Sequence, residues 1–112
     1  MQIDKQTENL MHEMQVLEQS LQQVLMEKQA LEVDLNEAVN ALEEVRKTKD
    51  DVYQVLGNIM IKVRKEEVIK NLEERNKLSG LRIKSIENQE KTIQSRIESL
   101  RKDLTKLISE KK

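Results

Sequence analysis

The sequence predicts a mainly α-helical protein, an antiparallel two-helix coiled coil whose helices are joined by one β-hairpin. Apolar residues recur at alternating steps of three and four in two long segments, which is the spacing of a coiled-coil seam. Between these segments the pattern changes to the two-residue alternation of a β-strand. The 112 residues contain no Pro, two Gly and 1% aromatic residues, so helix breakers are scarce and a compact core built on aromatic rings is not expected.

The first helix is expected over residues 3–50. From Ile3, alternate steps of four and three residues reach fifteen positions up to Val52, and twelve of them are apolar. A strict 3.5-residue repeat of this length specifies a left-handed seam. Lys28 and Lys49 are polar exceptions in the row, and Glu90 is one in the second helix. Such residues usually fix the register or orientation of a coiled coil.

The β-hairpin is expected over residues 51–64. Gly57 and Asn58 lie between two β-prone runs, 52–56 and 59–63. A pair of this kind favours a two-residue turn in which Gly adopts a positive φ. A lone two-stranded hairpin is marginal in water, and its edges carry unpaired N–H and C=O groups. Because no other segment has a strand pattern, the sequence predicts that partner strands come from other chains.

The second helix is expected over residues 66–110. Stepping back from Leu107 to Ile69 reaches twelve positions, nine of them apolar. Residues 1–52 carry a net charge of −7 and residues 53–112 a net charge of +6, so the two halves attract one another when the chain folds back. A fold-back that places Val52 near Val68 would bring Leu10 near Glu110 and Leu17 near Asp103.

Composition excludes several functions. There is no Cys, and His12 is the one histidine, so a zinc site of Cys and His is not expected. No nucleophile–base pair and no phosphate-binding loop is present, and we expect neither an enzyme nor a cofactor. No apolar run is long enough for a membrane span, and the polar start does not resemble a signal peptide. The expected location is therefore the cytoplasm.

The middle of the chain resembles a known family. A helix is followed by VYQVLGNIMIKV at 52–63, then by EEVIKNLEER at 66–75 and a long charged helix. This order resembles a prefoldin beta-type subunit of archaeal kind, since alpha-type subunits carry two hairpins. The resemblance covers essentially the whole chain, so residues 1–112 are expected to form one prefoldin-like domain.

The resemblance implies a hexamer of two alpha and four beta chains, whose hairpins join into intersubunit β-barrels. It also implies an ATP-independent holdase, which captures non-native client proteins at the coiled-coil tips and delivers them to a chaperonin. The hairpin residues expected to mediate subunit assembly are Tyr53, Val55, Leu56, Gly57, Asn58, Ile59, Met60, Ile61 and Val63.

Two further groups of residues are candidate sites at the tip. The side chains expected to bind clients are Ile3, Leu10, Met11, Met14, Leu104, Leu107 and Ile108. Met11 and Ile108 lie outside the seam rows, and a flexible Met suits varied partners. Ordinary seam packing is the alternative role for this group. The residues that would dock a chaperonin are Lys106, Glu110, Lys111 and Lys112, with a solvated helix end as the alternative.

Two other functions fit parts of the pattern. A structural coiled-coil adaptor or tether without client binding needs the helices but no β edge. An arm that grips RNA would use the basic half, yet the Lys and Arg of residues 64–112 alternate with Glu, and that segment has no aromatic residue for base stacking. We therefore expect no nucleic-acid partner, and the hairpin favours the chaperone subunit over the tether.

Overall fold

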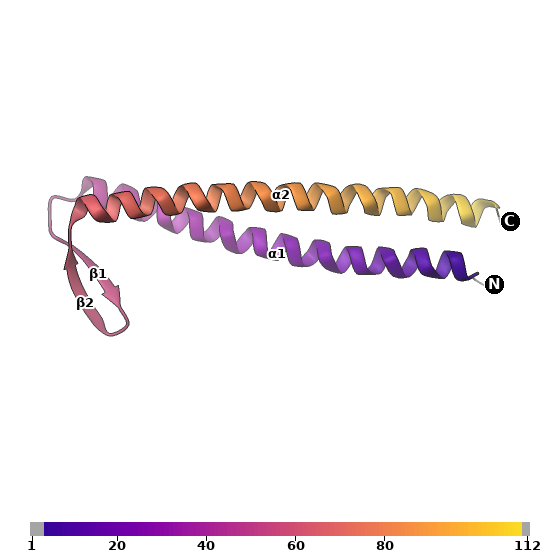
Figure 1. The fold of residues 1–112 in the computed structure, drawn as a ribbon, viewed down its shortest axis with the longest axis horizontal. Coiled ribbons are helices and arrows are strands. Elements are labelled where there is room, and N and C mark those ends of the chain that lie inside the picture. The colour runs from indigo at the N-terminus through magenta and orange to yellow at the C-terminus, as the bar shows by residue number, and fades with distance from the viewer. Residues whose placement is uncertain (1–3, 111–112) are drawn as a thin grey trace. The chain divides into compact units, whose positions relative to one another are not determined.

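The computed structural model describes residues 4–110 and contains two long helices joined by an antiparallel β-hairpin (Figure 1). In chain order the elements are α1 (Lys5–Lys47), β1 (Val52–Leu56), β2 (Ile59–Val63) and α2 (Lys65–Glu110). The expected fold class is confirmed. The first helix ends at Lys47 instead of residue 50. Three residues named as site candidates, Ile3, Lys111 and Lys112, lie outside the described residues.

Local hydrogen bonds explain where α1 begins and ends. Asp4 is its N-cap, because the Asp4 Oδ1 atom accepts a hydrogen bond of 2.8 Å from the Thr7 N–H, which satisfies one of the unpaired donors of a helix start. At the other end, the Lys65 Nζ atom donates to the backbone carbonyls of Arg46 and Thr48, at 3.3 and 2.8 Å. The first residue of α2 thus caps the last turn of α1 and closes the base of the hairpin.

The hairpin has the turn that the sequence predicts. Val52 pairs with Val63 and Leu56 with Ile59, which leaves the two-residue turn at 57–58. Gly57 has a φ of 60°, the left-handed region that favours glycine. Since directly paired residues share a face of the sheet, the strand residues divide between two faces. One face holds Val52, Gln54, Leu56, Ile59, Ile61 and Val63, and the other holds Tyr53, Val55, Met60 and Lys62.

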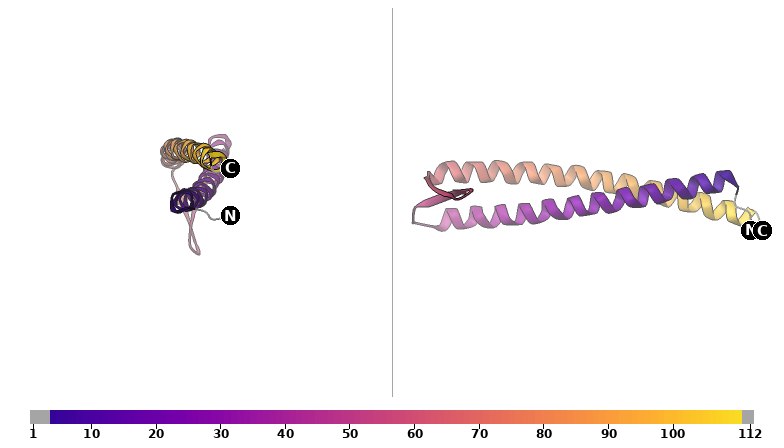
Figure 2. Two further views of the ribbon diagram at one scale, coloured as in Figure 1. Left: turned by 90° about the vertical axis from the view of Figure 1, so that its right-hand side faces the viewer. Right: turned by 90° about the horizontal axis from the view of Figure 1, so that it is seen from below.

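The helices divide into two units, each with its own stretch of seam. The terminal unit comprises residues 4–28 and 85–110, and the hairpin unit comprises residues 29–84. In each, a stretch of α1 lies antiparallel to a stretch of α2 (Figures 1 and 2). The buried seam residues are Thr7, Val24, Ile86, Ile97 and Leu100 in the terminal unit, and Ala38, Leu42 and Ser79 in the hairpin unit. All eight belong to the two heptad rows found in the sequence.

Ion pairs on the flanks of the seam show its register. The seam positions of each heptad are called a and d. Arg46 and Glu73 each directly follow a d residue, so both are e positions. Their side chains form an ion pair with one another. Two pairs join residues that each precede an a residue and are therefore g positions. These are Asp34 with Arg75 and Glu13 with Arg96.

This register corrects the one expected from the sequence. The e pair and the g pair of the hairpin unit together place Leu42 opposite Leu72. In the terminal unit, the g pair has the same offset from the facing seam residues as the g pair of the hairpin unit. It therefore places Leu10 opposite Leu104, whereas the sequence estimate placed Leu10 opposite Glu110. The expectation that Leu17 faces Asp103 is likewise wrong, since this register places Leu17 opposite Ile97. The error arose because the sequence shows the period of the seam but not the offset between its two rows.

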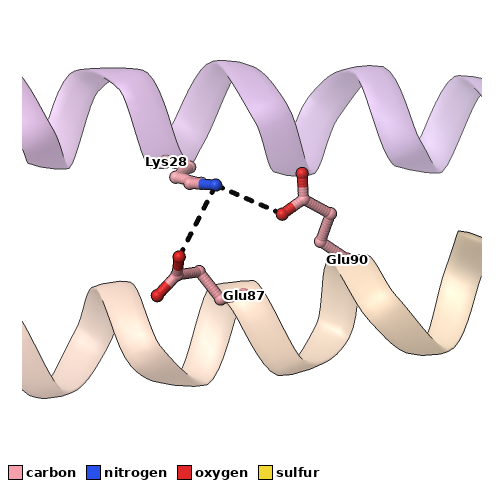
Figure 3. A network of polar contacts seen from close by, with 3 residues as sticks. All are labelled: Lys28, Glu87 and Glu90. Carbon is pink, nitrogen blue, oxygen red and sulfur yellow. Dashed lines mark hydrogen bonds and ion pairs between the residues drawn. The ribbon is translucent and has the colours of Figure 1, made fainter.

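A polar cluster interrupts the seam of the terminal unit (Figure 3). The Lys28 Nζ atom lies 3.2 Å from Glu90 Oε2 and 3.8 Å from Glu87 Oε2. The side chains of Lys28 and Glu90 are both largely shielded from solvent. A shielded ion pair adds little net stability over apolar packing, but removal of one partner leaves a charge with poor solvation. The cluster therefore favours this register over a shifted one, in which Glu90 would lose its cation.

Replacement of Lys28 alone should destabilise the coiled coil. In Lys28→Met the Glu90 carboxylate keeps its shielded position without the ammonium group, so we expect the free energy of unfolding to fall by about 1–3 kcal/mol. In Lys28→Met/Glu90→Leu no uncompensated seam charge remains, and stability should return to the wild-type value or exceed it. Urea unfolding followed by circular dichroism measures both. Equal losses in the single and the double variant would contradict this role.

Candidate functional site

The hairpin exposes most of its apolar side chains to solvent. Six of its apolar side chains are between 43% and 67% exposed. They are Tyr53, Val55, Leu56, Ile59, Met60 and Ile61. Gly57 and Asn58 are also exposed, and Val63 is half-buried at the base. Both faces of the sheet carry such residues, and exposed apolar surface of this kind marks a protein–protein interface.

The edges of the hairpin are open as well. Within residues 4–110 the sheet consists of β1 and β2 alone, so each strand has one outer edge without a strand partner. Open edges of β-prone strands pair readily with strands of other chains. The structure thus brings together the nine hairpin residues expected to mediate assembly. The outer edges of their two strands have no strand partner within residues 4–110.

A groove lies beside β1 in the hairpin unit and has a volume of about 400 Å³. It is lined by Ala41 and Val45 of α1, by Val68, Asn71, Leu72 and Arg75 of α2, and by Val52, Tyr53, Gln54 and Val55 of β1. Sequence reasoning did not find this groove, because its residues come from three elements. One signal was present: Ala41 and Val68 are g positions, which in coiled coils are usually charged.

The tip of the terminal unit contains the residues expected to bind clients. Four of them are half-buried seam residues, so they contribute to the packing between the helices. These are Leu10, Met14, Leu104 and Leu107. Met11 and Ile108 are 49% and 50% exposed. Both directly follow a d residue and are e positions, like the paired Arg46 and Glu73. The corrected register therefore places Met11 and Ile108 on the same flank of the tip.

The remaining candidates have simple surroundings. Lys106 and Glu110 are exposed on the last turns of α2, and His12 is exposed on α1. Among residues 4–110, no group of three His, Cys, Asp or Glu side chains is placed to hold a metal ion. Neither long helix contains, within these residues, an apolar stretch sufficient to cross a membrane.

Comparison with known proteins gives a consistent result. The family model described as "Prefoldin subunit" matches residues 8–111. The chain is 36% identical over 110 residues to the prefoldin subunit beta of Archaeoglobus fulgidus, and the match covers 96% of this chain and 95% of that protein. It is 33% identical over 100 residues to the same subunit of Pyrococcus furiosus, with coverage of 88% and 86%.

A solved structure is also similar. The crystal structure of the prefoldin beta subunit from Thermococcus strain KS-1 matches with a TM-score of 0.86 and 27% sequence identity, over 95% of each chain. Both kinds of comparison cover the hairpin and both helices together.

Proposed function

The chain belongs to the prefoldin subunit family, whose members are components of a chaperone, and we propose that it acts as a beta-type subunit of an ATP-independent holdase. In this proposal it assembles with an alpha-type subunit into a hexamer of two alpha and four beta chains in the cytoplasm. The assembled particle captures non-native proteins and passes them to a chaperonin.

The hairpin surface carries the assembly part of the proposal. Its exposed apolar side chains on both faces and its two open edges are unfavourable in an isolated chain in water. A β-barrel shared between subunits closes both edges and buries one of the two faces, because a closed barrel has no edges and turns one face of every strand inward. The face with Leu56, Ile59 and Ile61 is the more apolar one and suits the barrel interior.

The exposed flank at the tip carries the client-binding part. Met11 and Ile108 are half exposed although both are apolar, and they lie at the end of the helices away from the hairpin along the chain. Flexible apolar side chains adapt to partners of varied sequence. Unfolded chains expose apolar residues, so this flank supplies the complementary contacts.

Polar substitution of the flank should reduce client capture without affecting assembly. In Met11→Gln/Ile108→Gln, both apolar contacts are lost while the seam residues remain. We expect the rate of client aggregation in the presence of the particle to rise severalfold, with unchanged particle mass and helicity. Light scattering of a denatured client, measured without nucleotide, checks this. Val16→Gln is the control, because Val16 is a comparably exposed residue of the same helix. Equal protection by all three proteins would contradict the tip assignment.

The chaperonin would bind at the charged end of α2, through Lys106, Glu110, Lys111 and Lys112. The exposure of Lys106 and Glu110 supports this, since exposed charges attract a partner of opposite charge with a strong dependence on salt. The alternative function, a structural tether, keeps the coiled coil but binds no client. A particle of the expected mass that fails to suppress aggregation of any denatured protein would favour the tether.

A further inference from the structure

The helices of the hairpin unit carry exposed apolar side chains on their outer faces. In a heptad the outer face consists of positions b, c and f, which lie away from the seam. Val33 is an f position of α1, and Leu78 and Leu81 are c and f positions of α2. All three side chains are more than half exposed. Neither the seam nor the hairpin accounts for these apolar residues.

The charges around these residues have opposite signs on the two helices. Residues 29–45 of α1 contain five acidic residues and no basic one, whereas residues 75–84 of α2 contain four basic residues and no acidic one. Val33 lies in the acidic segment, and Leu78 and Leu81 lie in the basic segment. Each outer face therefore combines an apolar centre with surrounding charge of one sign.

Contacts inside the chain use only part of this attraction. The ion pair of Asp34 with Arg75 joins g positions of the two helices across the flank of the seam. Glu37 and Lys77 lie on the outer faces instead, at a c position of α1 and a b position of α2. Within residues 4–110, neither of these two side chains takes part in an ion pair. Outer charges of both signs thus remain available to another molecule.

We propose that the outer face of α1 around Val33 packs on the outer face of α2, at Leu78 and Leu81, of a neighbouring copy of the chain. The inference rests on the proposed assembly, which brings several copies together, and adds a contact between their helices. Opposite charges around the two apolar centres favour this contact, whereas like charges oppose contact between two α1 faces or two α2 faces. Since every copy carries both faces, the contact can repeat from copy to copy.

The register gives the two faces matching positions along the hairpin unit. The offset read from the flank ion pairs of this unit puts Val33 level with Leu81, and Glu37 level with Lys77. Copies arranged around an axis parallel to the helices are related by rotation and keep the same level along it. In this arrangement Val33 of one copy meets Leu81 of the next, and Glu37 lies beside the neighbour's Lys77.

The contact is small and depends on the hairpin. Three apolar side chains bury far less surface than the roughly 1,000 Å² expected of a stable interface. Once the hairpins hold two copies together, the effective concentration of one face near the other is high, and a weak contact then forms. Loss of the contact should accordingly leave the mass of the particle unchanged, while the helices of neighbouring hairpin units separate.

Carbodiimide cross-linking of isotope-mixed particles tests the contact. The reagent joins a carboxylate to an adjacent lysine amine, and so reports Glu37 beside Lys77 without any substitution. Particles are assembled with the alpha-type partner from equal amounts of isotope-labelled and unlabelled chain, so that only contacts between copies give cross-linked peptides of mixed isotope. We expect mixed-isotope peptides that join residues 29–45 to residues 75–84. They should be at least tenfold more abundant than mixed-isotope peptides that join α1 to α2 of the terminal units.

The other outcomes are distinct. Cross-links from either segment to the alpha-type partner, in place of mixed-isotope peptides, indicate a different occupant and overturn the proposal. A particle of the expected mass that gives only single-isotope peptides overturns the helix contact but leaves the proposed assembly intact. A chain that stays monomeric in native mass spectrometry overturns the proposed assembly as well.

Polar substitution of the apolar centres provides an independent measurement. Val33→Gln/Leu81→Gln keeps both cross-linking groups but removes the apolar contact, so the yield of mixed-isotope peptides should fall at least fivefold with unchanged particle mass and helicity. Val16→Gln/Met26→Gln is the matched control, because both are exposed apolar residues of α1 outside the acidic segment. Equal yields from the two double variants would exclude these faces as the contact.

Discussion

Ile59→Lys/Ile61→Lys should leave the chain folded as a coiled coil but largely unassembled. Both residues lie on the more apolar face of the hairpin, and both are exposed in the isolated chain. Full burial of an Ile side chain contributes about 1.5–3 kcal/mol. The variant loses two such contributions and adds two ammonium groups to an apolar interface. Since about 1.4 kcal/mol corresponds to a tenfold change in affinity, the association should weaken by at least roughly a hundredfold.

Native mass spectrometry and analytical ultracentrifugation measure this loss of assembly. Val33→Lys is the control, because Val33 is similarly exposed but lies on α1 away from the hairpin. That variant should keep the wild-type mass. A double variant that still forms the complete particle at micromolar concentration would show that the hairpin faces do not carry the interface.

Leu100→Ala should cause the largest loss of stability of any truncation in the seam. Leu100 is 0% exposed and is the one large side chain fully buried among residues 4–110. Truncation of a buried Leu to Ala costs about 2–5 kcal/mol, because the transfer free energy is lost and a cavity remains. The loss falls in the terminal unit, so client binding at the tip should weaken together with stability.

Denaturant unfolding monitored by circular dichroism measures the effect. Leu78→Ala is the matched control, since Leu78 is an exposed leucine of the same helix, and substitutions at such positions usually change stability by less than about 0.5 kcal/mol. Equal unfolding midpoints for the two variants would show that Leu100 is not packed as the structure describes. Assembly through the hairpin should persist in Leu100→Ala, because the hairpin unit does not contain this residue.

Much of the fold follows from local patterns in the sequence. The two heptad rows identify the buried seam residues, Leu42 and Ile97 among them. Gly57 with its positive φ and the pairing of Leu56 with Ile59 follow from the Gly-Asn turn. These features depend on residues close in sequence, which is why the period and the turn residues suffice to predict them.

The candidate site was predictable in part. Exposure of Met11 and Ile108 follows from their places outside the seam rows, and the structure agrees. That these two side chains lie on the same flank could be predicted only from the correct register between α1 and α2, and the register estimated from the sequence was wrong. The groove beside β1 was not predicted, because it depends on how the hairpin lies against Ala41 and Val68.

The amino-acid sequence by itself determined the two helices, the turn of the hairpin and the faces that each helix buries, since period and turn chemistry act over a few residues. The tertiary structure decided the offset between the two seam rows and the different surroundings of the two hairpin edges. A shift by one heptad preserves the apolar pattern, so the pattern cannot select the offset. The cap from Lys65 to the end of α1 and ion pairs such as Glu13 with Arg96 accompany one offset, and these contacts join residues far apart in the chain.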